Sequence, residues 1–174
     1  MIWWLFASCW YFGSIHALER AYVNQDFEVL QKQLQHSHQR YMREQSALFL
    51  SQIPSETIEE HSKADIIPLL LECVQDEEEF SDVRAACAVT LGNWQVFEAV
   101  VPLIKASTQM KTEEDRYWMY YALAKLKSKS AISHLQAQKT TDILLQQSLQ
   151  DWAKNPNTEL DLRPIFQVYF EDER

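Results

Sequence analysis

The chain has 174 residues and a formal net charge of −9, and it contains only two glycines and five prolines. This composition favours helices and leaves little material for hairpin turns or glycine-built loops. Nucleic-acid binding depends on Lys and Arg side chains that neutralise phosphates, so the negative charge argues against a DNA or RNA partner. The length fits one domain with a sizeable core.

The three cysteines, Cys9, Cys73 and Cys87, are too few and too far apart for a disulfide framework. Apolar residues flank Cys73 and Cys87, so we expect buried free thiols on helices. A single bridge between these two residues is the alternative in an oxidising compartment.

The amino-terminal segment is apolar, because residues 2–18 contain no Asp, Glu, Lys or Arg. As a helix it would span about 26 Å, close to the ~30 Å hydrocarbon core of a bilayer. We predict an apolar helix over residues 1–23 and interpret it first as a retained single membrane span. The side chains expected to contact the membrane are Trp3, Trp4, Leu5, Phe6, Trp10, Tyr11 and Phe12.

Two other interpretations of this segment stay open. A cleaved signal peptide would lead to export, although the segment lacks a basic start and Ala17 makes a poor cleavage site. The third interpretation is a helix buried against the domain or a partner subunit. If the segment spans a membrane, Arg20 and Lys32 on its carboxyl side place the rest of the chain in the cytoplasm.

The remainder of the chain alternates apolar helical stretches with short polar breaks. Pro54 stops one helix, and Thr112 stands before Glu113 and Glu114, whose charges suit a helix amino end. The predicted helices cover residues 26–36, 38–53, 56–75, 81–94, 96–107, 113–127, 130–138 and 140–154.

Three of these helices share one pattern. Arg43, Arg84 and Arg116 are each followed after seven residues by a leucine and then by a small residue. A mostly apolar helical face recurs at the same offsets from each arginine. The preceding helices also match, since IIPLLLE at 66–72 and VVPLIKA at 100–106 share a proline flanked by aliphatic residues. The arginine spacings of 41 and 32 residues lie in or near the range of helical repeats.

The stretch IIPLLLECVQDEEEFSDVRAACAVTLGNW at 66–94 resembles a HEAT repeat, particularly the bacterial HEAT-like type also found in bilin lyases. The resemblance implies an all-α fold: a short right-handed α-solenoid of about three to four helical hairpins over residues 24–155. In that family, an acid and an arginine at the start of the second helix tie adjacent repeats together. The resemblance therefore assigns structural roles as repeat joints to Asp82, Arg84, Asp115 and Arg116.

Three regions are candidates for contact with other protein subunits. The aromatic residues of the third copy, Tyr117, Trp118, Tyr120 and Tyr121, either fill space against a neighbouring repeat or form an exposed recognition surface. The acidic loop with Glu77, Glu78 and Glu79 is either solubilising or a docking site for a basic partner. In the tail, residues 156–174, the alternation of Phe166, Val168 and Phe170 with polar residues or tyrosine predicts an extended segment that caps the last repeat or joins a partner's sheet.

The sequence offers no pattern that announces catalysis, a cofactor or a metal. His36 and His38 lack further ligands at zinc spacing, so we interpret them as part of a solvated turn. Two glycines cannot build a phosphate loop, and no G-x-S-x-G motif occurs. We predict a non-enzymatic scaffold or adaptor, an accessory subunit of a membrane-associated assembly. The alternative, implied by the resemblance to bilin lyases, is an enzyme or chromophore chaperone acting on a tetrapyrrole.

Overall fold

The computed structural model describes residues 15–138, 143–156 and 158, and every regular element in this part of the chain is helical. The prediction of an all-α fold is therefore confirmed. After the helical residues 15–23, the α-helices are α2 (Phe27–His36), α3 (Arg40–Gln52), α4 (Glu60–Gln75), α5 (Ser81–Asn93), α6 (Val100–Gln109), α7 (Glu113–Leu126), α8 (Lys129–Ala137) and α9 (Ile143–Lys154). Two short 3-10 helices, η1 (Ser55–Thr57) and η2 (Phe97–Ala99), precede α4 and α6.

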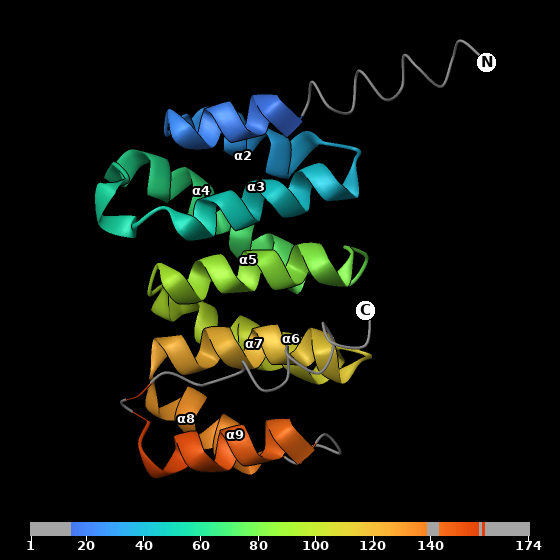
Figure 1. The fold of residues 1–174 in the computed structure, drawn as a ribbon, viewed down its shortest axis with the longest axis vertical. Helices are drawn as coiled ribbons and strands as arrows, with labels where there is room; N and C mark the ends of the chain where they lie inside the picture. Colours follow the sequence, from blue (N-terminus) through green and yellow to red (C-terminus); the bar gives the residue numbers. More distant parts are fainter. Residues whose placement is uncertain (1–14, 139–142, 157, 159–174) are drawn as a thin grey trace, which may run out of the picture.

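Consecutive helices pack as pairs, and the pairs follow one another along the longest axis of the molecule (Figure 1). The second helices of the first three pairs, α3, α5 and α7, pack side by side in one row. The first helices, α2, α4, α6 and α8, contact one another in a second row. Residues 15–23 extend the first row, because the Tyr22 ring stacks on Phe49 of α3 with centroids 4.9 Å apart.

The apolar face predicted from the arginine pattern lies in the core. In α5 the side chains of Val83, Cys87, Thr90 and Leu91 have no exposed surface. The equivalent positions of the two neighbouring helices are also buried, apart from the half-buried Phe49 and Asp115. Burial of these faces against the neighbouring helices is the main stabilising contribution to such an arrangement.

Cys73 and Cys87 form a disulfide that joins α4 to α5. The expectation of two free thiols is therefore wrong, and the alternative of a single bridge is what the structure contains. The two cysteines lie 14 residues apart and are brought together because α4 and α5 pack antiparallel across a short loop. The bridge fixes the two helices of one pair rather than joining one pair to the next.

Three turns that lead from the first row to the second contain a residue with positive φ: Gln25, Gln95 and Lys127. At the first turn, Asp26 N donates to Ala21 O; at the second, Val96 N donates to Leu91 O. This six-residue closure is the Schellman end of a helix, in which glycine usually takes the left-handed position. Glutamine occupies that position in both turns, so the same chain reversal is built twice without glycine.

None of the helices within the described residues is long and apolar enough to cross a membrane. Of the predicted apolar helix, residues 15–23 are described, and Leu18 and Ala21 are buried. Several predicted contact residues lie outside the described part of the chain: Trp3, Trp4, Leu5, Phe6, Trp10, Tyr11 and Phe12 of the amino terminus, and Phe166, Val168 and Phe170 of the tail.

Candidate functional site

Arg84 is bound to the end of the preceding helix. Its Nε and Nη2 atoms donate to Val74 O at 3.0 and 2.9 Å, and only 5% of the residue is exposed. Val74 lies in the last turn of α4, where main-chain carbonyls lack partners within the helix and a cation is favourable. Burial lowers the pKa of Arg84, while the charges of Glu77 and Asp76 oppose that shift. Arg84 therefore caps α4 and ties it to α5.

Asp82 joins two helix pairs. Its Oδ2 atom accepts a 2.5 Å hydrogen bond from Nε of Arg40 at the start of α3, and the two side chains form an ion pair. The Arg40 guanidinium also lies 4.9 Å from the centre of the Phe80 ring, within the range of a cation–π contact. Asp82 thus contacts the preceding pair, whereas Arg84 acts within its own pair.

In α7, the third helix with the repeated arginine pattern, Asp115 and Arg116 make different contacts from Asp82 and Arg84. Arg116 Nε donates to Thr112 O at 3.1 Å, within the first turn of α7. The main-chain N of Asp115 donates to the Thr112 hydroxyl at 3.1 Å, so Thr112 is the N-cap of the helix. These bonds organise the start of α7, and Arg116 makes a local contact where Arg84 makes one to another helix.

Arg43 binds Glu79 through two parallel bonds that link α3 to the acidic loop. Nε and Nη2 of Arg43 donate to the two carboxylate oxygens at 2.9 and 2.8 Å, and Nη1 donates to Ser37 O at 2.5 Å. The two side chains are 16% and 14% exposed. Glu79 is therefore engaged within the chain, whereas Glu78 is exposed and Glu77 accepts from Gln109 Nε2 at 2.5 Å.

At the other end of the α3 and α5 helices, side chains bind main-chain carbonyls across helix pairs. Trp94 Nε1 donates to Leu50 O and Ile53 O, both at 3.1 Å. Asn93 Nδ2 donates to Ser51 O at 3.1 Å, and Gln95 Nε2 donates to Lys125 O at 2.9 Å. The sequence analysis missed these contacts, because main-chain acceptors leave no complementary residue type to detect.

The four aromatic residues of α7 divide into two kinds. Tyr117 and Tyr120 are 1% and 4% exposed and belong to the core, so the interpretation of an exposed recognition surface is wrong for them. Burial raises the pKa of Tyr120, whose hydroxyl donates to Gln138 Oε1 at 3.0 Å. Trp118 and Tyr121 are half-buried, and their rings meet edge to face with centroids 6.4 Å apart.

Tyr121 has equivalents in the two neighbouring helices. Counting from each repeated arginine, Leu48 of α3, Val89 of α5 and Tyr121 of α7 occupy the same position, and all three are half-buried. Because α3, α5 and α7 pack side by side, these three positions form one line across the helices. We call the row formed by α3, α5 and α7 the outer row. Lys125 Nζ lies 5.3 Å from the centre of the Tyr121 ring.

Glu44 places a second carboxylate near that of Asp82, close to the starts of α3 and α5. Burial raises the pKa of Glu44, the nearby Asp82 carboxylate raises it further, and Arg40 opposes both effects. The neighbourhood is therefore acidic despite the Arg40–Asp82 pair.

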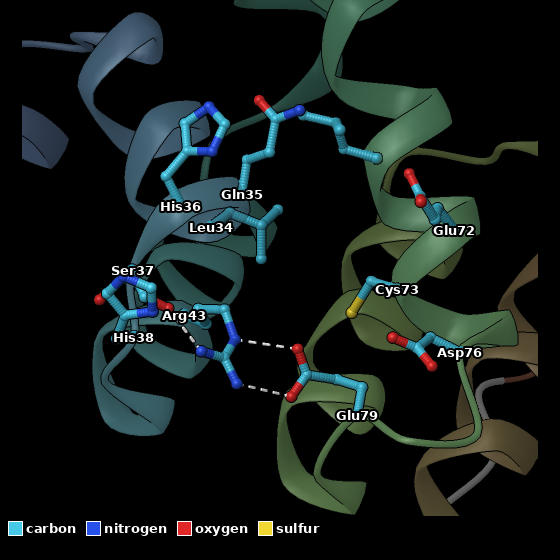
Figure 2. A pocket seen from close by; sticks show the side chains of 11 residues that line it. Leu34, Gln35, His36, Ser37, His38, Arg43, Glu72, Cys73, Asp76 and Glu79 are labelled. Carbon is cyan, nitrogen blue, oxygen red and sulfur yellow. Dashed lines mark hydrogen bonds and ion pairs between the residues drawn. The ribbon is translucent and has the colours of Figure 1, made fainter.

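A pocket of about 470 Å³ lies between the α2–α3 turn and the second half of α4 (Figure 2). His36 and His38 line one side, and Glu72, Asp76 and Glu79 lie on or after α4 on the other. The Arg43–Glu79 pair bridges the two sides. The described residues contain no group of three or more His, Cys, Asp or Glu side chains that could hold a metal ion.

Ser107 and His134 form the other arrangement that resembles reactive chemistry. Ser107 Oγ lies 3.0 Å from His134 Nε2 but donates its proton to Ile104 O at 2.8 Å. Burial lowers the pKa of His134 and Ser107 is 1% exposed, so this pair is a buried structural contact.

Comparison with known proteins adds no assignment. The sequence matches no protein-family model, and it matches none of the curated proteins.

Proposed function

We propose that this protein is a short right-handed α-solenoid of HEAT type that binds another protein through the outer row and serves as a non-enzymatic scaffold. The observation that carries the proposal is the line of Leu48, Val89 and Tyr121, half-buried apolar or aromatic side chains at one position of three adjacent helices. A regular row of this kind provides an extended surface for a partner, as in repeat proteins where each unit contacts only its neighbours.

The chemistry of the surface supports a protein partner. Tyr and Trp are favoured at the centres of protein interfaces, and Trp118 lies edge to face with Tyr121 beside the row. Glu44 lies beside the Arg40–Asp82 ion pair at one end of the same helices and adds a further carboxylate there. A partner with an apolar centre flanked by basic residues matches this pattern.

The proposed place in the cell follows from the amino terminus. The uncharged residues 2–18 would attach the protein to a membrane as an accessory subunit of a membrane-associated assembly. Arg20 and Lys32 favour a cytoplasmic position of the helical pairs, whereas the Cys73–Cys87 bridge favours an oxidising compartment, the exported alternative. Extraction of native membranes with alkaline carbonate, followed by intact-mass measurement, tests this part. Release into the soluble fraction, or a mass that lacks residues 1–17, contradicts it.

A matched pair of valine substitutions tests the binding surface. Val89 lies in the outer row, whereas Val101 lies on α6 in the other row of helices and is 74% exposed. We expect Val89→Lys to abolish co-purification of the partner from native cells in mild detergent and Val101→Lys to leave it unchanged. Circular dichroism should give both variants the wild-type helix content.

Two results would contradict the proposal. One is a wild-type chain that stays monomeric, needs no detergent and co-purifies with nothing. The other is equal loss of the partner from both valine variants.

A further inference from the structure

The two cysteines of the Cys73–Cys87 disulfide differ in burial. Cys87 has no exposed surface, whereas Cys73 is half-buried and lines the pocket beside α4. In Figure 2 the Cys73 sulfur points from α4 toward the Arg43–Glu79 pair that bridges the pocket. The pocket of about 470 Å³ is large enough for a small molecule beside Cys73.

We propose that Cys73 is a modification site at which a small aliphatic thiol exchanges with the disulfide. The thiolate sulfur forms a bond to Cys73 Sγ while the Cys73–Cys87 bond breaks. The electron pair of the broken bond leaves on Cys87 Sγ, which takes a proton from solvent. The products are a mixed disulfide on Cys73 and a free thiol at Cys87, and the entering thiol is the only co-reactant.

Access decides which sulfur reacts. Thiol–disulfide exchange requires the attacking thiolate to approach a sulfur, and its rate depends on which sulfur is reached. Cys87 is enclosed by core residues of α5 and its neighbours, so an approach to it requires the helices to separate. In the folded protein the adduct therefore forms on Cys73.

The charges of the pocket select the class of thiol. Glu72 and Asp76 are exposed acids of its lining, while Glu79 is neutralised by its ion pair with Arg43. Arg84, which binds Val74 O beside Cys73, opposes the charge of Asp76 from the core, so Glu72 leaves the lining with a net negative charge. A thiol with a positive group is attracted to the pocket, and one with a negative group is repelled.

Two thiols of similar size and opposite charge test the proposal. Non-reduced full-length protein is treated with cysteamine or with 2-mercaptoethanesulfonate at pH 8 and low ionic strength. The reaction is quenched by unfolding in urea with excess N-ethylmaleimide, and the protein is mapped by peptide mass. Each rate is divided by the rate for the same thiol with the protein unfolded in urea. We expect the thiol adduct on Cys73, the maleimide on Cys87, and a normalised preference for cysteamine on the order of tenfold that falls in 1 M salt.

A charge variant with a matched control identifies the source of the preference. Glu72→Gln removes a negative charge from the pocket, and Glu98→Gln removes the same charge from exposed η2, outside the pocket. The first substitution should lower the preference about threefold, and the second should leave it unchanged. Circular dichroism is used to verify that both variants are folded.

Three outcomes overturn the proposal. Labelling of Cys73 and Cys87 by maleimide before any thiol is added would show that the bridge is absent. Adducts on Cys87, or divided evenly between the two cysteines, would show reaction after unfolding. Equal normalised rates for the two thiols would show that the pocket does not select by charge.

Discussion

The junction of α3 with α5 and the junction of α5 with α7 are built differently, although the same kind of helix pair repeats at both. At the first, Thr90 Oγ1 lies 2.8 Å from Ala47 O, Trp94 binds two carbonyls of the preceding pair, and two arginine–acid pairs cross between the pairs. At the second, α5 approaches α7 so closely that a Cβ added at Gly92 would lie 2.8 Å from Ala122 Cα. Directional bonds are numerous at the first junction, whereas the second combines close contact with fewer bonds, among them the one from Gln95 Nε2 to Lys125 O.

The two junctions illustrate two ways in which neighbouring helices are kept in register, by hydrogen bonds and by close packing. Hydrogen bonds to specific carbonyls fix both the distance and the sliding of one helix along another. Close packing of small residues fixes the distance through shape and is sensitive to a single added methyl group. Substitutions at the two junctions should therefore fail for different physical reasons.

The largest effect is expected from Gly92→Ala at the α5–α7 junction. Alanine is favoured over glycine inside a helix by about 1 kcal/mol, so an open site would be stabilised. The contact with the main chain of Ala122 instead forces the helices apart, and overpacking of this kind costs about 1–3 kcal/mol. Because the contact is with main chain, we expect the upper end of this cost, about 3 kcal/mol, which less the helix gain gives a net loss of about 2 kcal/mol in urea unfolding.

The equivalent position of α3 provides the control for Gly92. Ser51 occupies it, is half-buried, and donates only to Leu48 O of its own helix at 2.7 Å. Ser51→Ala should change the free energy of unfolding by less than about 0.5 kcal/mol. A stabilised Gly92→Ala variant would show that α5 and α7 do not approach as described.

The second effect concerns Trp94 at the α3–α5 junction. Trp94→Phe retains an aromatic ring but removes the indole N–H that binds Leu50 O and Ile53 O. Buried carbonyls that lose a donor cost about 1–3 kcal/mol, and we expect about 1.5 kcal/mol in urea unfolding. Asn93→Ala removes a neighbouring bond from an exposed side chain, where water replaces it, and should cost under about 0.5 kcal/mol. Equal losses in both variants would contradict this account.

The sequence predicted the helices and their apolar faces well, because periodicity is a local property. Recurrence singles out Arg84 in the sequence, but its acceptor, Val74 O, is a main-chain atom and leaves no trace in residue types. The sequence places Glu79 in a loop that is either solubilising or a docking site, and it does not reveal the ion pair with Arg43, because that pair joins residues 36 positions apart. Residue patterns are therefore a better guide to which side chains make important contacts than to which atoms those side chains contact.

The third effect compares the stability contributed by an ion pair between two helix pairs with that of an ion pair within one helix. Glu79→Gln weakens the two bonds to Arg43, which is 16% exposed, and should cost about 1 kcal/mol in low salt and less in 1 M salt. Glu60 pairs with Lys63 within α4 and is 89% exposed, so Glu60→Gln should cost at most about 0.3 kcal/mol. Thermal unfolding at two salt concentrations compares them. A loss from Glu79→Gln no larger than the control would show that the pair contributes nothing to the junction.

The smallest expected effect distinguishes the contribution of the left-handed backbone of a turn residue from the contribution of its side chain. Gln25 and Gln95 have nearly the same left-handed φ, 53° and 56°, in Schellman turns with the same hydrogen bonds. Glycine adopts this conformation without the steric cost of a Cβ, so Gln25→Gly should stabilise the protein by about 0.5–1 kcal/mol. Gln95 Nε2 additionally donates to Lys125 O of α7, and loss of that bond should offset the gain and leave Gln95→Gly near zero.

The comparison of the two glutamines is measured by the difference between their variants in urea unfolding. A positive value for Gln25→Gly and one near zero for Gln95→Gly would isolate the contribution of a single side chain to the α5–α7 junction. Equal stabilisation of both would mean that the bond to Lys125 O contributes nothing, and close packing at Gly92 would then be left to define that junction. Destabilisation of Gln25→Gly would contradict the left-handed turn itself, because glycine is favoured there.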